Sequence, residues 1–169
     1  VDLIEGTARL SGEHEVTVDG KKKVSGRFIL VATGSRPKVV PGFEFDGERI
    51  LSSDHALLLE KLPKRLLILG GGVIGCEFAY IMNSFGVEVT VAEMMEHLLP
   101  LEEKETVAIL ERSFKKSGIQ FHTGTKATGV QKTGNEVSAT LETADGEQKT
   151  VKADQVLVVF GRAPNSQGI

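Results

Sequence analysis

Short runs of hydrophobic residues, most of them followed by glycine or proline, define the predicted elements of this chain. The runs at residues 66–69 and 87–92 predict two buried strands. The segment between them predicts a helix that ends at Gly86, because apolar residues recur at helical spacing: Ile74, Phe78, Ile81 and Phe85. Strand, glycine turn, helix and strand over residues 66–93 together predict a βαβ unit with parallel strands.

The second half of the chain changes period twice. A second helix fits residues 102–116, and a strand fits 119–121. An apolar period of two then predicts three antiparallel strands, joined by turns at Gly134-Asn135 and Asp145-Gly146: residues 126–132, 136–142 and 148–151. Residues 155–160 are apolar and predict a buried last strand. The predicted fold class is α/β, a mainly parallel sheet with an inserted three-stranded antiparallel meander.

The first third is predicted to hold short strands at residues 8–11 and 15–18 and a strand buried on both faces at 27–32. Ser52 or Ser53 is expected to cap a helix that runs to Lys61. A meander followed by a buried strand occurs twice, at 7–34 and 124–161, which suggests two related dinucleotide-binding folds with the first one incomplete.

Composition narrows the class of function. Among 169 residues, 20 are Lys or Arg and 23 are Asp or Glu, so no basic surplus favours nucleic acid as a partner. No apolar run reaches the roughly 18 residues of a membrane span. The single cysteine, Cys76, excludes an internal disulfide and a multi-cysteine metal site, and no metal site is expected. A lone thiol fits a reducing compartment, so a cytoplasmic location is expected.

The segment Gly70–Gly75 reads GGGVIG and matches G-x-G-x-x-G between a strand and a helix. In this motif Gly70 makes the turn, Gly72 lets main chain approach a pyrophosphate, and Gly75 lets helix and strand pack closely. Glu93 ends the next strand, where a carboxylate can bind the adenosine ribose and repel a 2′-phosphate. The motif predicts NAD rather than NADP. The alternatives are a purely structural turn and a solvated Glu93.

Other polar residues have a structural and a chemical interpretation. Glu77 in the first helical turn either complements the helix dipole or serves a cofactor. Cys76 is expected to be a packing residue, and the four histidines share no ligand spacing. Lys21-Lys22-Lys23 is expected to be a solvated turn. Arg162 could contact cofactor phosphate or cover the sheet.

Three segments resemble the flavoprotein disulfide reductases, and most closely their dihydrolipoamide dehydrogenase branch: residues 66–93, ATGSRP at 32–37 and DQVLVVFGRAPN at 154–165. The resemblance implies a Rossmann-like FAD/NAD(P)-binding fold. It also implies an NAD-dependent flavoprotein that passes electrons between NADH, FAD, a cysteine pair and a disulfide. The implied NAD contacts are Gly70, Gly71, Gly72, Val73, Ile74, Gly75, Glu77, Glu93, Ala127 and Gly161, and the implied FAD contacts are Ala8, Thr33, Gly34 and Ser35.

The family's FAD pyrophosphate loop, its C-x-x-x-x-C pair and its dimer domain are not found in this sequence. We therefore expect a central fragment without catalytic residues that binds NAD weakly and FAD not at all. Its expected parts are an FAD-domain segment at 1–62, an NAD-binding domain at 63–162, and a return toward the FAD domain at 163–169. The expected partners are the remainder of a homodimeric flavoprotein and a 2-oxo acid dehydrogenase complex. The alternatives are an NADH oxidase, a ferredoxin or nitrite reductase, and a stand-alone NAD-sensing module.

Overall fold

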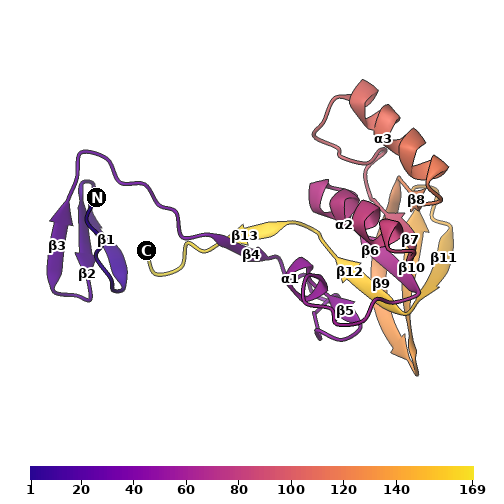
Figure 1. The fold of residues 1–169 in the computed structure, drawn as a ribbon, viewed down its shortest axis with the longest axis horizontal. Coiled ribbons are helices and arrows are strands. Elements are labelled where there is room, and N and C mark those ends of the chain that lie inside the picture. Colours follow the sequence, from indigo (N-terminus) through magenta and orange to yellow (C-terminus); the bar gives the residue numbers. More distant parts are fainter. The chain divides into compact units, whose positions relative to one another are not determined.

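The structure is a computed structural model that describes residues 1–169 as two compact units. Unit 1 holds residues 1–36 and 163–169, and unit 2 holds residues 37–162. Figure 1 shows the order of the elements along the chain. The segments at the boundary are β4 (Ser35–Pro37) and β13 (Arg162–Pro164), which pair as a two-stranded sheet. Each unit is described by itself.

Unit 2 is built on a five-stranded sheet of order β5-β12-β6-β7-β8. All neighbouring strands in it are parallel. The strands are β5 (Ile50–Leu51), β6 (Arg65–Leu69), β7 (Glu88–Ala92), β8 (Gln120–His122) and β12 (Gln155–Val158). Their carboxyl ends therefore meet at one edge, which is where parallel sheets bind ligands.

Helices cover one face of this sheet and the meander covers the other (Figure 1). The helices are α1 (Ser53–Ala56), α2 (Val73–Ser84) and α3 (Lys104–Lys116). Leu66 and Ile68 of β6 pack in the core that contains α2 and α3, whereas Leu67 and Leu69 pack in the core that contains the meander. An unbroken apolar strand thus serves two cores, because successive side chains point to opposite faces.

The meander consists of β9 (Thr125–Thr133), β10 (Glu136–Thr143) and β11 (Gln148–Ala153), all antiparallel. The Arg65 guanidinium ties β6 to this layer, since it lies 2.6 Å from a Glu136 oxygen and 2.7 Å from an Asp154 oxygen. Its hydrogen bonds hold the pKa of both carboxyl groups below the usual range. These contacts fix the meander against the sheet near the amino end of β6.

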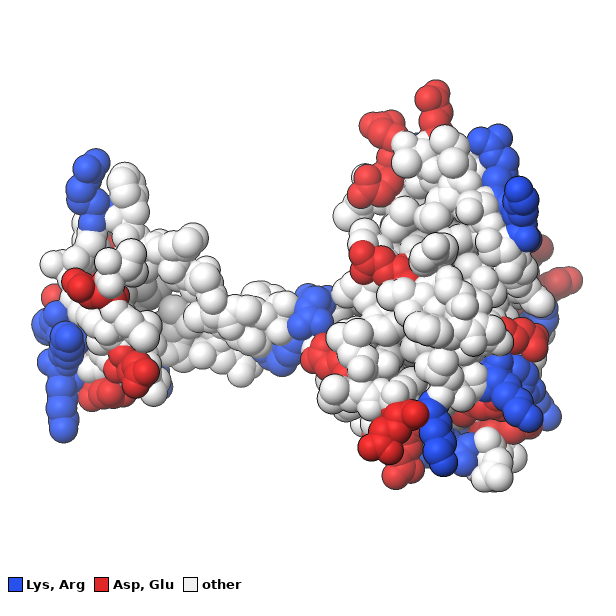
Figure 2. Space-filling model, in the orientation of Figure 1, with Lys and Arg blue, Asp and Glu red and all other residues white.

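The outer face of α2 and its C-cap residue, Phe85, expose apolar side chains beside the exposed Glu77. Val73, Tyr80, Ile81 and Phe85 are 56%, 64%, 43% and 70% exposed. Figure 2 shows largely uncharged surface in the region of α2, with charges of both signs toward the periphery of this face. None of the helices is long and apolar enough to cross a membrane.

Unit 1 contains one three-stranded antiparallel sheet of β1 (Ala8–Gly12), β2 (Glu15–Val18) and β3 (Lys22–Ser25). A turn at Asp19-Gly20 joins β2 to β3, a strand that the sequence analysis did not predict. Lys23 of the predicted solvated turn belongs to β3, and its ammonium lies 3.0 Å from a Glu15 oxygen.

The prediction of an α/β fold with a parallel sheet and an inserted antiparallel meander is confirmed. The predicted buried strand at residues 27–32 is wrong, because this segment forms no strand and its side chains are mostly exposed. Phe28 is 85% exposed and Leu30 is 90% exposed. A strand buried on both faces needs neighbours on both edges and layers above and below, and this segment has none of them here.

Several predicted bounds also differ, and the end of α1 differs most. Ser52 caps α1 as expected, with its hydroxyl 3.2 Å from the His55 nitrogen, but the helix ends at Ala56 rather than Lys61. Leu57 and Leu58 are 73% and 80% exposed, so no buried face sustains further turns. The strand predicted at residues 155–160 is β12, which ends at Val158. Residues 37–62 lie in unit 2 by compactness, whereas their assignment to an FAD segment stays a prediction.

Candidate functional site

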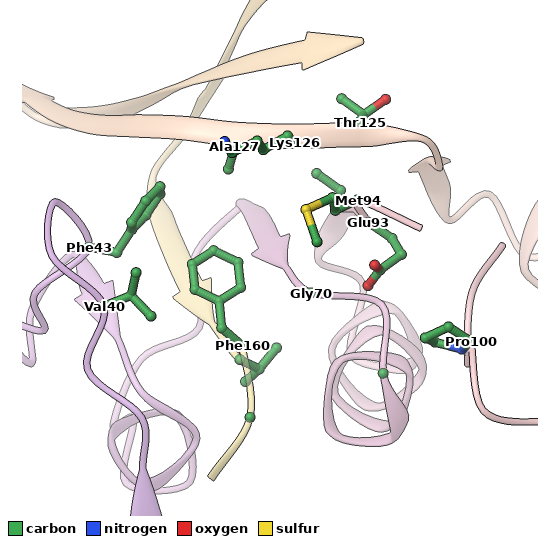
Figure 3. A pocket seen from close by; sticks show the side chains of 14 residues that line it. Val40, Phe43, Gly70, Glu93, Met94, Pro100, Thr125, Lys126, Ala127 and Phe160 are labelled. Carbon is green, nitrogen blue, oxygen red and sulfur yellow. The ribbon is translucent and has the colours of Figure 1, made fainter. Parts of the chain in front are cut away.

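A cavity of about 490 Å³ lies at the carboxyl edge of the parallel sheet in unit 2. Three parallel strands lead into it, since Gly70, Glu93 and Val159 directly follow β6, β7 and β12. Its lining is Val40, Phe43, Gly70, Gly72, Ala92, Glu93, Met94, Pro100, Thr125, Lys126, Ala127, Val159, Phe160 and Gly161 (Figure 3). Parallel α/β sheets bind nucleotides in such a place.

Each glycine of the G-x-G-x-x-G motif meets a different local requirement. Gly70 has φ +112°, and a Cβ there would lie 2.6 Å from the Val159 carbonyl oxygen. A Cβ on Gly75 would collide with the Gly70 carbonyl oxygen, so this glycine lets α2 pack against the end of β6. Gly72 has no atom within 4 Å of its Cβ position, although it lines the cavity. The first and third glycines are required by the protein, and the second leaves open space.

The open space at Gly72 lies at the amino end of α2. Gly72 is the N-cap residue and provides no side chain to the helix. The Cys76 N–H donates to the Gly72 carbonyl at 2.9 Å, which is the first hydrogen bond of the helix. The N–H groups of the first turn before Cys76 have no partner within the helix, and the helix dipole adds partial positive charge there. This arrangement suits a phosphate group.

Glu93 lies at the end of β7, is 9% exposed and lines the same cavity. One carboxylate oxygen accepts a hydrogen bond from the Gly71 N–H at 2.6 Å, and the other accepts one from the Met95 N–H at 2.8 Å. A carboxylate oxygen has two lone pairs, so each can still accept a hydroxyl from a ligand. Glu93 therefore couples the glycine loop to the rim of the cavity.

The opposite side of the cavity is apolar. The rings of Phe43 and Phe160 meet edge to face, with centroids 5.1 Å apart and an angle of 86° between the planes. Figure 3 shows Val40, Phe43 and Phe160 on one side of the cavity and Glu93 and Pro100 on the other, with Gly70 between them. The cavity thus offers an aromatic wall, a bare main-chain floor and a carboxylate.

The structure gathers five of the sequence-predicted NAD residues around the cavity: Gly70, Gly72, Glu93, Ala127 and Gly161. Gly71 and Gly75 lie buried directly behind it. Val73, Ile74 and Glu77 belong to α2 and do not line the cavity, and the Glu77 side chain is exposed.

The four predicted FAD contacts belong to unit 1. Ala8 lies on β1 and is exposed. Thr33 donates its hydroxyl to the Asn165 carbonyl at 2.6 Å, and the Asn165 N–H donates to the Gly34 carbonyl at 3.0 Å. Ser35 begins β4. Thr33 and Gly34 are therefore held by Asn165 of the same unit.

Sequence reasoning missed most of the cavity wall. Phe160 and Val159 adjoin Gly161 at a strand end, and Thr125 and Lys126 adjoin Ala127, so proximity to predicted residues could have found them. Val40 and Phe43 flank Pro41-Gly42 in a loop and belong to no recognisable sequence motif. Their place in the cavity follows only from the fold.

The structure shows the contacts of Cys76 and Arg162, two residues whose roles the sequence left open. Cys76 is buried with no partner cysteine, and burial, with the nearby charge of Glu93, raises its pKa to about 12. It is a packing residue whose thiol donates to the Gly71 carbonyl at 3.3 Å. The Arg162 guanidinium lies 3.5 Å from an Asp54 carboxylate oxygen, next to α1.

Comparison with known proteins gives one consistent picture. The whole chain, residues 1–169, matches the family described as pyridine nucleotide-disulphide oxidoreductase. It is 40% identical over 171 residues to the dihydrolipoyl dehydrogenase of Thermus scotoductus, covering 100% of this chain and 37% of that protein. It is 46% identical over 143 residues to the dihydrolipoyl dehydrogenase of Bacillus subtilis, covering 83% of this chain and 30% of that protein. The chain therefore spans about a third of the length of these relatives.

Solved structures agree with the sequence relatives. LpdA from Mycobacterium tuberculosis matches with a TM-score of 0.77 and 34% identity, over 99% of this chain and 36% of that one. The flavoprotein disulfide reductase RclA from Escherichia coli matches with a TM-score of 0.76 and 28% identity, over 99% of this chain and 38% of that one. Both matches extend over the glycine loop and its cavity as well as the sheet. The chain belongs to the pyridine nucleotide-disulphide oxidoreductase family.

Proposed function

We propose that the cavity of unit 2 binds NAD(H) and that the chain is the NAD-binding part of an FAD-dependent dithiol/disulfide oxidoreductase of the dihydrolipoyl dehydrogenase type. The observation that carries the proposal is the open space at Gly72, which lies between the first turn of α2 and the Glu93 carboxylate. A dinucleotide carries a diphosphate and a ribose diol on one molecule, and the cavity offers one group suited to each.

The roles of the residues follow from their positions. The first-turn N–H groups of α2 would hold the diphosphate, and Glu93 would accept hydrogen bonds from the adenosine ribose hydroxyls. The other half of the dinucleotide would then extend past Val159 and Gly161, along the side of the cavity that carries Phe160. Bound NAD would supply the hydride chemistry, and this chain would bind and orient it.

The same geometry favours NAD over NADP. A 2′-phosphate would lie against the Glu93 carboxylate, which repels it. Lys126 is the one cation in the lining, and strand alternation turns its side chain to the opposite face of β9 from Thr125 and Ala127. We therefore expect no compensating cation at the ribose.

Titration calorimetry with NADH tests the proposal. Gly72→Ala adds a methyl group that meets no protein atom, so the variant should fold normally and lose at least about tenfold in affinity, since the methyl occupies ligand space. Gly129→Ala is the matched control, because its Cβ also meets no atom within 4 Å and it lies outside the cavity lining. Absence of NADH binding by the wild-type chain, or full affinity in Gly72→Ala, contradicts the proposal.

The wider setting is carried over from the relatives as part of the proposal. We infer a homodimeric parent flavoprotein that binds FAD, acts on a dithiol such as dihydrolipoamide, serves a 2-oxo acid dehydrogenase complex and works in the cytoplasm. The dihydrolipoyl dehydrogenase relatives support the dithiol substrate. A C-x-x-x-x-C pair upstream of Val1 in the parent sequence would favour this reaction, and its absence there would favour an NADH oxidase or ferredoxin reductase.

A further inference from the structure

Glu93 makes two contacts with main chain that a ribose-binding role does not require. Its two carboxylate oxygens accept hydrogen bonds from the Gly71 N–H at 2.6 Å and from the Met95 N–H at 2.8 Å. The first N–H lies in the glycine loop, and the second lies just past the end of β7. One side chain thus joins the floor of the cavity to its rim.

Gly71 occupies the variable position of the motif, yet it is held from both sides. Its carbonyl accepts a hydrogen bond from the Leu99 N–H at 2.8 Å and a second from the Cys76 thiol at 3.3 Å. A Cβ on Gly71 would lie 2.6 Å from Leu98 Cδ2 and 2.9 Å from Glu93 Cβ. Both main-chain groups of Gly71 therefore point into the protein, while its neighbour Gly72 faces the cavity.

Two of the contacts on Gly71, those from Leu98 and Leu99, come from residues 94–100, which we call the strap. Leu99 adopts φ +47°, a left-handed conformation that leucine disfavours, and in it donates to Gly71. The strap is itself fixed, because the Met95 carbonyl accepts the Gly124 N–H at 2.7 Å and Leu98 is fully buried. A strained residue persists where its surroundings determine it, and such residues gather at ligand sites.

We propose that Glu93 is a positioning residue for the diphosphate, acting through Gly71 together with the strap. By holding the Gly71 N–H while Leu99 holds the Gly71 carbonyl, it sets the peptide planes that place Gly72 and the first turn of α2 against the ligand. The proposal rests on the proposed function and adds to it that part of the contribution of Glu93 to binding does not pass through the ribose.

Glu93→Gln separates the two roles. Glutamine keeps the shape, but one carboxylate oxygen becomes an NH₂ group, so one of the two N–H donors faces another donor. NADH and an NADH analogue with a 2′,3′-dideoxyadenosine ribose are titrated against the wild type and the variant. We expect at least a fivefold loss of affinity for both ligands. Glu88→Gln is the matched control on the exposed, opposite end of β7 and should leave both affinities unchanged.

The outcomes differ for each idea. A loss confined to NADH means that Glu93 acts through the ribose alone and overturns the proposal, as does equal affinity of wild type and variant for both ligands. Failure of the wild type to bind NADH contradicts the proposed function instead.

A measurement without ligand decides the positioning role by itself. In Glu93→Gln the amides of Gly71 and Met95 should exchange hydrogen at least tenfold faster than in the wild type. The Val159 amide, which donates to the Leu69 carbonyl at 2.9 Å, should keep its rate and so report an intact sheet. Wild-type exchange rates at Gly71 and Met95 overturn the proposal.

Discussion

Gly75→Ala tests how closely α2 packs against the end of β6. The added Cβ would collide with the Gly70 carbonyl oxygen and lie 3.4 Å from Val159 Cγ2. Neither partner can easily move, because the Gly70 N–H donates to the Ala92 carbonyl at 2.9 Å and α2 is anchored by buried side chains. Relief of the overlap therefore requires the first turn of α2 to shift away from the sheet by roughly 1 Å.

The expected cost follows from that shift. Overpacking of a core costs about 1–3 kcal/mol. A gap of about 0.5–1 Å also forfeits a quarter to a half of the dispersion energy of the contacts it opens. Alanine regains about 1 kcal/mol over glycine in helix propensity. The lost dispersion energy and the gain in helix propensity oppose each other, so we expect the unfolding free energy of unit 2 to fall by about 1–3 kcal/mol. Gly72→Ala has room at φ −71° and should stay within about 1 kcal/mol of wild type.

Urea unfolding followed by circular dichroism at the helical minimum measures these values. All three helices lie in unit 2, so the signal reports that unit. The reasoning is refuted if Gly75→Ala unfolds with a free energy within about 0.5 kcal/mol of the wild type, or if Gly72→Ala is destabilised as much as Gly75→Ala.

Three further predictions concern groups outside the motif. Burial raises the pKa of Asp46, but three main-chain N–H groups and Lys132 outweigh it and hold that pKa far below the usual range. Its stabilisation is therefore present above the ordinary aspartate pKa of about 4 and lost as pH falls, so the stability gap between wild type and Asp46→Asn should shrink from about pH 6 to about pH 3; a constant gap argues against it. Cys76, buried with a pKa of about 12, should react with iodoacetamide far more slowly in the folded chain than in urea, and equal rates would show an accessible thiol. Leu58→Ser should leave the urea midpoint of the helical signal unchanged, because Leu58 belongs to unit 2 and is 80% exposed, and a loss above about 1 kcal/mol would mean that the side chain is buried.

The parallel sheet of unit 2 could be predicted because its evidence is local. The glycine turn between β6 and α2, the helical spacing within α2 and the apolar run of β7 occupy fewer than thirty consecutive residues, about the length of one βαβ unit. Each element has its stop signal next to it, as Gly86 does after α2. The handedness of such a crossover then leaves almost one arrangement.

Two similar apolar runs show where prediction from the local sequence fails. Residues 27–32 and 155–160 are both largely apolar runs followed within two residues by a glycine, and both were assigned to buried strands. The second run lies between β5 and β6 and is buried, whereas the first has no strand beside it and is exposed. An apolar run indicates that burial would be favourable, but the strands and helices that would bury it are formed by other parts of the sequence.

Some residues of the candidate site could be predicted from local sequence, and others depend on packing between distant segments. Gly70, Gly75 and Glu93 could be assigned from the sequence because their requirements arise within one strand-turn-helix-strand unit. Gly71 could not, since the motif leaves its position free. Its need for glycine arises from Leu98 and Glu93, whose atoms would lie within 3 Å of any Cβ. A motif thus states what the ligand and the local turn require, and the packing around the loop adds requirements specific to this chain. We therefore expect Gly71→Ala to lower both the stability of unit 2 and its affinity for NADH, although the motif alone would allow the substitution. A Gly71→Ala variant with wild-type stability and NADH affinity would show that Leu98 and Glu93 move aside to admit the methyl group.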